Sequence, residues 1–200
     1  DDIASISPCD RENDEGGWID FIKVSLASGV SYTPRARSSY VSSSCGLCSL
    51  EESHLKKIEP LSSAGWAPIH LSQATIKEYL EKFNRHPSLF SLTGGAHAAA
   101  LFSPQGELSY HAADVGRHNA VDKVIGASMN ADLEELSGWS LFVSSRAGYE
   151  IALKAYKVAV GALITIGAAS SGAHRLSCES GLPLYSFVRP SRAHRHHQPL

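Results

Sequence analysis

The sequence predicts an α/β fold, a three-layer α/β/α sandwich built on a mixed or mostly parallel sheet. From about residue 72 onward, segments with helical spacing alternate with strand-like segments, as in a sheet covered by helices on both faces. The segment "ALITIGAA" (162–169) is almost wholly apolar, as expected of a central parallel strand buried on both faces. Residues 1–70 are interrupted by Gly, Ser and Pro. We therefore expect a small irregular N-terminal portion over 1–70 and an α/β domain over 71–200.

Hydrophobic spacing and turn residues define the elements in order. The alternation in "WIDFIKVSL" (18–26) predicts a strand. Ser72 is a candidate N-cap for a helix over 73–86, which Pro87 ends. The elements expected after it are a strand at 89–92, a small-residue helix following the Gly-Gly turn of "TGGAHAAALF" (93–102), a strand at 107–113, a helix at 116–129, a strand at 139–145, a helix at 146–161, the strand at 162–169, a short helix at 172–180 and a strand at 182–188. The basic tail from residue 189 shows no periodicity.

The composition excludes several classes of protein. With 43% hydrophobic and 19% charged residues, the chain is globular rather than disordered or fibrous. A formal net charge of −2 gives no support to sequence-independent nucleic-acid binding, and no apolar run approaches the roughly 20 residues of a membrane helix. The acidic start does not resemble a signal peptide, and four cysteines are too few for a secreted disulfide scaffold. We therefore expect a cytoplasmic protein without nucleic-acid or membrane partners.

The chain opens with Asp1 and contains a single methionine. We expect it to be part of a longer protein, and the N-terminal portion to be incomplete.

Three expected loops at the ends of sheet strands carry unusual residues. Ligands of open α/β sheets bind at the carboxyl ends of the strands, and the N–H groups of a helix N-terminus favour an anion. A Gly-Gly pair is more often a plain tight turn, and an ion pair between Arg146 and Glu150 is the competing account of the third loop. The residues concerned are Gly94, Gly95 and His97 in the first loop, Asp114, Arg117, His118, Asn119 and Asp122 in the second, and Ser145 and Arg146 in the third. Together they predict a pocket for an anionic, hydrogen-bonding ligand such as a nucleotide.

Cys45 and Cys48 form a Cys-x-x-Cys pair in a serine-rich stretch. A disulfide clip, half of a zinc site, a redox pair and a sulfur-carrying nucleophile are the chemistries to weigh. A closed zinc site needs four ligands, and the histidines at 194, 196 and 197 lie in the tail without forming a clear partner set, so we expect no structural metal. A thioredoxin-type pair would need a βαβ context that is absent from the surrounding sequence. A nucleophilic cysteine on an exposed loop remains, while Cys178 is interpreted as a small buried apolar residue.

Several of these stretches together resemble the formate dehydrogenase accessory (FdhD) family. They are "SSCGLCS", "TGGAHAAALF", "DVGRHNAVDKVIG", "SSRAGYEIALKA" and "FVRPSR", in this order. The resemblance implies a homodimeric, cytoplasmic sulfurtransferase with a fold similar to that of cytidine deaminase. Such a protein accepts sulfur from a cysteine desulfurase as a cysteine persulfide. It then transfers this sulfur to the molybdenum bis(molybdopterin guanine dinucleotide) cofactor, which is its bound substrate and which formate dehydrogenase requires.

The same resemblance assigns roles to individual residues. Cys45 would carry the persulfide and Cys48 would be its partner. The cofactor-binding stretch of the family falls on Phe187, Val188, Arg189, Pro190, Ser191 and Arg192. Two departures from the family pattern are Ala113, where an acidic residue is usual, and Ser49, where a glycine is usual. The tail "RPSRAHRHHQP" also differs from the usual one.

Two other functions stay open on the residues alone. A chaperone could hold the guanine dinucleotide cofactor without sulfur chemistry, in which case nucleotide binding would not depend on Cys45. A dithiol–disulfide oxidoreductase could use the same cysteine pair and would need no nucleotide pocket.

Overall fold

The computed structural model describes residues 2–12, 18–33, 66–86, 93–131, 133 and 136–196. The chain divides into two compact units, Asp1–Tyr40 and Val41–Leu200, which are described separately. The boundary expected near residue 70 stays a prediction, and the strand expected at 89–92 lies outside the described residues.

The first unit is a two-stranded antiparallel hairpin. Strand β1 (Ile3–Glu12) pairs with β2 (Trp18–Leu26), and β2 coincides with the predicted strand. Ile6 stands opposite Val24, and both side chains are largely exposed.

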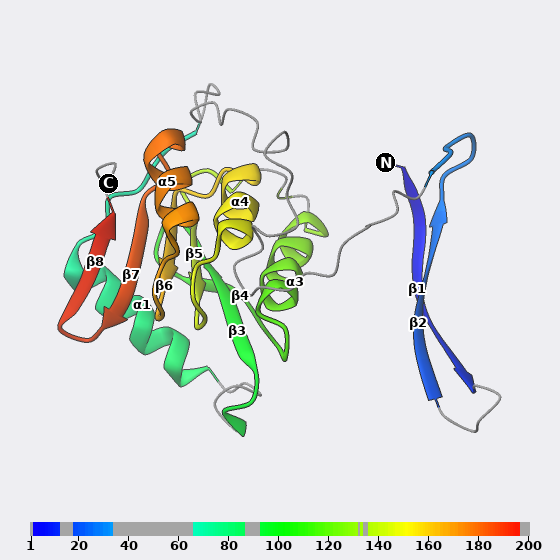
Figure 1. Ribbon diagram of the computed structural model, residues 1–200, viewed down its shortest axis with the longest axis horizontal. Helices are drawn as coiled ribbons and strands as arrows, with labels where there is room; N and C mark the ends of the chain where they lie inside the picture. The colour runs from blue at the N-terminus through cyan, green and yellow to red at the C-terminus, as the bar shows by residue number, and fades with distance from the viewer. Residues whose placement is uncertain are drawn as a thin grey trace. The chain divides into compact units, whose positions relative to one another are not determined.

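The second unit is built on a six-stranded mixed sheet with the order β4-β3-β5-β6-β7-β8 (Figure 1). Strands β5, β6 and β7 run parallel, β3 pairs antiparallel with β4 and β5, and β8 pairs antiparallel with β7. The strand bounds are His97–Phe102 (β3), Leu108–Asp114 (β4), Ser140–Val143 (β5), Ala162–Thr165 (β6), Leu184–Arg189 (β7) and Arg192–His196 (β8).

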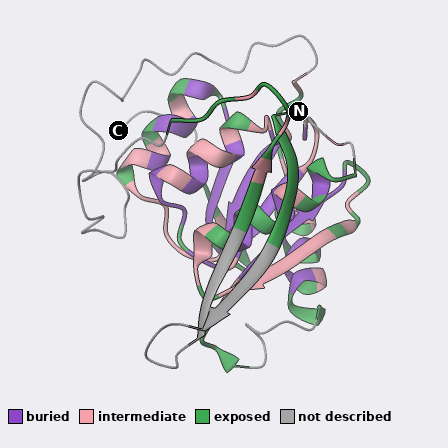
Figure 2. Cartoon of the chain, turned by 90° about the vertical axis from the view of Figure 1, so that its right-hand side faces the viewer, coloured by how far each residue is buried: buried purple, intermediate pink, exposed green. Residues whose placement is uncertain are grey.

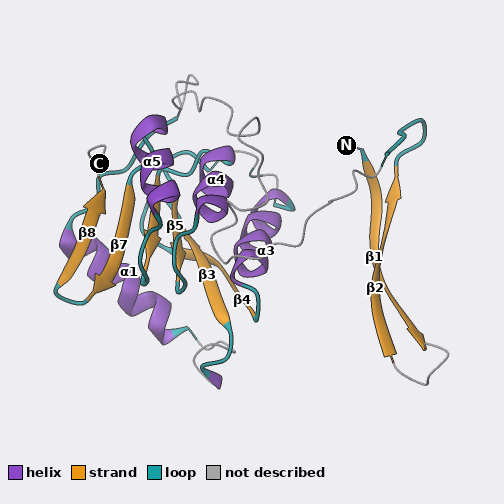
Figure 3. Cartoon of the chain, viewed as in Figure 1, coloured by secondary structure: helices purple, strands orange, loops and turns teal. Residues whose placement is uncertain are grey.

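Helices cover both faces of this sheet, which confirms the predicted three layers (Figure 3). Helix α1 (Gln73–Arg85) packs on one face, and its start is capped by Ser72, whose Oγ accepts from the Thr75 N–H. The other face is covered by α3 (Arg117–Met129), α4 (Tyr149–Lys157) and α5 (Ser171–Ser180). The central strands β3, β5 and β6 are almost wholly buried (Figure 2), whereas the edge strands β4 and β8 are not. The expected likeness to cytidine deaminase stays a prediction.

The small-residue helix expected within 93–102 is wrong, because this segment forms β3. Alanine is the strongest helix former, but here Ala99 pairs with both Ala112 and Val143 in the interior of the sheet. Ala98 and Ala100 contact the α1 side and Ala99 the α3 side. The small side chains let both helical layers approach the strand closely.

The tail from residue 189 shows no periodicity, yet Arg192–His196 forms β8 along the edge of the sheet. Four of the five residues of this strand are Arg or His, so the segment lacks the apolar alternation by which strands are recognised. This segment becomes a strand because it pairs with β7, although its own sequence lacks a hydrophobic pattern.

The segment before α1 is anchored at the amino-terminal ends of the parallel strands. The Trp66 indole N–H donates to the Val160 carbonyl at 3.2 Å, and the Ile69 N–H donates to the Gly161 carbonyl at 2.8 Å. A Cβ atom at Gly161 would lie 2.6 Å from Cγ1 of Ile69, so a glycine is required there. The segment before α1 is therefore attached to the sheet next to the start of β6, at the edge opposite the carboxyl ends of the parallel strands.

Within the described residues, no helix has the length and apolar character needed to cross a membrane.

The packing of His111 predicts a sensitivity to acid. Its ring stacks on His86 at 4.2 Å between centroids, and its Nε2 is buried without a hydrogen-bond partner in the described structure. Burial, aided by the nearby His86, lowers the pKa of His111 from 6.5 to about 4. The unfolded chain then binds the extra proton between these pH values, so the free energy of unfolding should fall as the pH decreases from 6.5 to 4, by at most about 3 kcal/mol.

Urea unfolding of wild type and His111→Phe across this range measures the effect. The variant keeps an aromatic ring but cannot be protonated, so its stability should decline less in acid, while the two proteins stay comparable at pH 8. Parallel pH profiles for the two proteins would contradict the assignment.

Candidate functional site

The carboxyl ends of β4, β5, β6 and β7 meet at one edge of the sheet, as the strand directions require. Helices α3, α4 and α5 each begin at this edge. Loops that leave parallel strands and enter helices are the usual ligand sites of such sheets. Two of the three predicted loops, those after β4 and β5, are confirmed as such junctions.

Backbone hydrogen bonds continue the parallel pairing past the ends of β5 and β6. The Gly167 N–H donates to the Ser145 carbonyl at 3.1 Å, and the Ala147 N–H donates to the Ala168 carbonyl at 3.0 Å. The Ser170 N–H returns to the Ala147 carbonyl at 2.9 Å. The two loops are thus held as an extension of the sheet, which makes their side chains a fixed platform.

Gly167 is the point where the neighbouring segments come closest. A Cβ atom there would lie 2.9 Å from Cγ of Arg146 and 2.9 Å from the Ser145 carbonyl oxygen, a distance that a side chain cannot occupy. On the other side, the Phe187 N–H donates to the Gly167 carbonyl at 2.9 Å. Gly167 therefore brings the loop of Arg146 and the end of β7 together across one backbone segment.

A pocket of about 170 Å³ opens on the α4 side of this platform. It is lined by Arg117 and Arg146 together with residues 147–148 and 168–170. Gly148 is the N-cap residue of α4, and Ser170, whose Oγ accepts from the Ala173 N–H, is that of α5. Two guanidinium groups beside two helix N-termini make this pocket favourable for an anion.

Asp114 organises the loop that carries Arg117. Its carboxylate accepts from the Gly116 N–H at 2.8 Å and the Asn119 side-chain amide at 3.2 Å, and it lies 2.6 Å from the Lys123 ammonium. The Lys123 hydrogen bond first, and then the Gly116 N–H, lower the pKa of Asp114 to about 2. Asp114 and Asn119 therefore shape the turn in front of α3 rather than line the pocket.

His118 and Asp122 connect α3 to α4. His118 Nε2 lies 3.2 Å from a Glu150 carboxylate oxygen, and Lys154 donates to Asp122 at 2.6 Å. The predicted alternative of an Arg146–Glu150 pair within one helix is wrong, because Arg146 precedes α4. These contacts fix the spacing of the two helices behind the pocket.

The first predicted loop takes a different form from the one expected. Gly94 and Gly95 precede β3, so no helix begins there, and Gly95 N–H already donates to the Thr93 hydroxyl. His97, the first residue of β3, stands opposite Asp114. Burial, followed by the charges of Arg117 and Arg146, lowers the pKa of His97. His97 thus lies within the electrostatic field of the pocket arginines and stays neutral.

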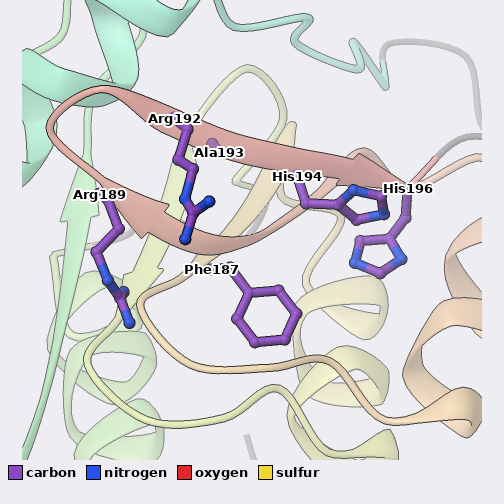
Figure 4. Close-up of a pocket in the computed structure, with 6 residues that line it drawn as sticks. All are labelled: Phe187, Arg189, Arg192, Ala193, His194 and His196. Atoms are coloured by element: carbon purple, nitrogen blue, oxygen red, sulfur yellow. The ribbon is translucent and has the colours of Figure 1, made fainter.

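A larger pocket of about 510 Å³ lies along β7 and β8 (Figure 4). Phe187, Arg189 and Arg192 of the predicted cofactor stretch line it, together with Ala193, His194 and His196. Val188 instead faces the α1 side of the core and is buried, while the exposed Pro190 and Ser191 form the turn between the strands.

Phe187 holds an uncommon backbone conformation at the lip of this pocket. Its φ is +52°, and half of its side chain is exposed. A left-handed conformation is rare for a bulky residue and marks strain that the surroundings must support. The hydrogen bond to Gly167 supplies part of that support, and the break in the register of β7 with β8 between Ser186 and Arg189 accompanies it.

Sequence reasoning missed the loop after β6, at 168–170, and the two pocket histidines of β8. The signal for the loop was present, since "GAASSG" follows an apolar strand and ends in a serine suited to an N-cap. The histidines could not be placed without the edge strand. Cys45 and Cys48 lie outside the described residues, so their predicted roles stay predictions.

Comparison with known proteins places this chain among its relatives. The family model described as FdhD/NarQ matches residues 1–199. A protein of Mycobacterium bovis named sulfur carrier protein FdhD is 35% identical over 197 residues, covering 94% of this chain and 71% of that protein. A protein of Saccharolobus solfataricus, also named sulfur carrier protein FdhD, is 39% identical over 155 residues, covering 78% of this chain and 58% of that protein.

A solved structure gives a similar result. A protein from Desulfotalea psychrophila, described as a formate dehydrogenase accessory protein, superposes with a TM-score of 0.61 at 27% identity, over 68% of this chain and 58% of that one. The chain therefore spans between about half and three quarters of the length of these relatives. The match over nearly the whole sequence shows that this chain belongs to the FdhD/NarQ family.

Proposed function

We propose that this chain is a sulfur carrier that serves formate dehydrogenase. In this proposal it accepts sulfur from a cysteine desulfurase as a persulfide on Cys45. It then delivers the sulfur to the molybdenum bis(molybdopterin guanine dinucleotide) cofactor bound at the carboxyl edge of the sheet. The names of the relatives support the sulfur-carrier role. The observation that carries the proposal is the pair of cationic pockets on either side of Gly167.

The chemistry of the pockets suits a guanine dinucleotide. Arg117 and Arg146 in one pocket and Arg189 and Arg192 in the other offer forked donors for diphosphate oxygens. The exposed ring of Phe187 offers a flat surface on which a base can stack. Arg189 is held in place by its own hydrogen bond to the Ile166 carbonyl at 2.8 Å, so little ordering is needed on binding.

The sulfur step balances with the two cysteines alone. The Cys45 thiolate attacks the outer sulfur of the desulfurase persulfide, the desulfurase cysteine leaves as a thiolate, and Cys45 carries S–SH. Attack of the Cys48 thiolate on the Cys45 sulfur then releases HS⁻ and forms a Cys45–Cys48 disulfide. The two electrons that reduce the outer sulfur to sulfide come from the cysteine pair, which an external thiol must reduce again.

The length of the chain between the cysteine pair and Trp66 allows Cys45 and Cys48 to reach the site. Cys48 precedes the anchored Trp66 by 18 residues, which at about 3.3 Å per extended residue span up to roughly 60 Å. Strand β6 has four residues, so the two edges of the sheet are separated by only about 13 Å at that strand. The homodimer and the cytoplasmic location that the resemblance implies remain predictions.

A cofactor-holding chaperone is the second candidate, because every residue of the two pockets lies outside the Cys-x-x-Cys stretch. This role requires nucleotide binding but no persulfide, so the next two experiments separate it from sulfur transfer.

Cys45→Ala should abolish sulfur loading. After a brief incubation with a cysteine desulfurase and cysteine, the intact mass of the wild type should rise by one sulfur atom before Cys48 releases the sulfide, and a reductant should remove the gain. Cys48→Ala should still accept sulfur but should release sulfide more slowly, because its resolving thiolate is gone. An equal mass gain in wild type and Cys45→Ala would refute the proposed carrier residue.

Arg146→Ala should weaken guanosine diphosphate binding by roughly tenfold or more, because a charge-assisted hydrogen bond contributes about 1.5–3 kcal/mol. Isothermal titration calorimetry at low salt measures this, with Arg175→Ala, an exposed arginine of α5, as the matched control. Equal affinities for the two variants would remove Arg146 from the site. Unchanged nucleotide binding in Cys45→Ala together with no sulfur loading of the wild type would favour the chaperone.

A further inference from the structure

The side chains of the larger pocket follow a fixed order along the β7–β8 hairpin. Arg189 pairs with Arg192 next to the turn, and Ser186 pairs with His194 farther from it. Phe187 lies between these two pairs in β7. Figure 4 shows the same order, with the guanidinium groups at one end, the imidazole rings at the other and the Phe187 ring between them. The pocket therefore has an arginine end and a histidine end.

Phe187 reaches the pocket because the strand changes face at this residue. The Ser186 hydroxyl contacts His196 on the α5 side of the sheet, whereas Val188 packs on the α1 side. Residues two apart in a regular strand face the same side, so Phe187 marks a bulge, as its φ of +52° and the break in register also indicate. Bulges of this kind redirect a side chain beside a site. Here the bulge directs an aromatic ring into the pocket.

His194 is the lining side chain whose acceptor nitrogen is left for a ligand. Arginine offers donors only, whereas a neutral imidazole has one acceptor nitrogen, and none of the described residues that line the pocket is acidic. His196 engages both of its ring nitrogens, Nδ1 at 3.0 Å from Nδ1 of His174 and Nε2 at 2.8 Å from Oγ of Ser186. His194 is exposed, and no hydrogen bond joins its ring to the described residues.

The ring of His194 is nevertheless held in place by its neighbour. It stands edge-on to the ring of His196, with an interplanar angle of 88° and 4.6 Å between centroids, an arrangement that aromatic rings favour. His196 is in turn fixed by the fully buried Ser186 and by His174 of α5. Since His194 rests on a ring that is itself fixed, a ligand bound to it needs to order little of the protein.

We propose that the guanine nucleotide lies along this hairpin with its diphosphate at the arginine end and its base at the histidine end, where His194 accepts a hydrogen bond from a guanine N–H. This inference rests on the cofactor binding proposed above and adds a contact outside the 187–192 stretch. A nucleotide and the pocket share one polarity, charge at one end and a flat ring next to it. The reverse orientation would place the N–H edge of guanine against guanidinium donors, and unpaired donors are costly.

Ligand truncation tests this orientation in the full chain, by calorimetric titration of guanosine diphosphate alone and in competition with guanosine or pyrophosphate. His194→Ala should weaken the diphosphate nucleotide and guanosine by the same factor, about 3- to 10-fold for one uncharged hydrogen bond, and should leave pyrophosphate unchanged. Arg192→Ala should instead weaken the diphosphate nucleotide and pyrophosphate roughly tenfold or more and leave guanosine unchanged.

Two further variants separate a hydrogen bond from ring packing. His194→Gln keeps an acceptor and should retain most of the nucleotide affinity, whereas His194→Phe keeps a ring without an acceptor and should behave like His194→Ala. All three variants leave the fold intact because the side chain is exposed. His70→Ala is the matched control, an exposed histidine that contacts Arg195 and does not line the pocket, and it should bind like the wild type.

The possible failures are distinguishable. If the wild type binds guanosine diphosphate and His194→Ala binds it equally well, or loses pyrophosphate affinity in parallel, His194 does not contact the base and the orientation is overturned while the proposed cofactor binding stands. If the wild type binds no guanosine diphosphate, the proposed cofactor binding fails and the orientation fails with it.

Discussion

The site depends on backbone hydrogen bonds that extend the parallel sheet beyond its strands. Donation from Gly167 to Ser145 and from Phe187 to Gly167 joins three loops that are remote in sequence. In an open loop, water would form hydrogen bonds with these backbone N–H and C=O groups at little net cost in free energy. The backbone hydrogen bonds therefore matter mainly because they hold the three loops in one geometry. This geometry is available only because position 167 lacks a side chain. Both pockets open beside this residue, and a movement of its backbone would therefore change the distance between their arginines.

Close packing elsewhere in the molecule keeps that edge rigid. The alanines of β3 let α1 and α3 pack tightly on opposite faces of the sheet. The His118–Glu150 contact and the partly exposed Lys154–Asp122 ion pair join α3 to α4, and both helices begin at the site. Exposed ion pairs contribute little to stability, so their role is positional. Asp114 acts similarly, because its hydrogen bonds to Gly116 and Asn119 are local and shape the turn before Arg117.

The order of elements after residue 72 was largely predictable, because helix spacing, the Ser72 cap and the apolar run at 162–169 are local signals. Two segments were not. The 97–102 segment has the residues of a helix, and only its neighbours in the sheet make it a strand. Strand β8 lacks apolar alternation and takes its order from β7. The same limit applies to the site: Arg117 and Arg146 were found from loop position, whereas His194 and His196 needed a strand that sequence alone did not reveal.

The larger pocket, along the β7–β8 hairpin, combines two kinds of side chain. Arg189 and Arg192 carry permanent charge, whereas His194 and His196 place imidazole rings at the other end of the pocket. The two guanidinium groups attract a diphosphate, and this attraction falls with ionic strength over a Debye length of roughly 8–10 Å. The imidazole rings offer hydrogen-bonding groups rather than permanent charge. A ligand bound along the hairpin would therefore be held by charge at the arginine end and oriented by hydrogen bonds at the histidine end, so the two ends contribute differently to affinity and to specificity.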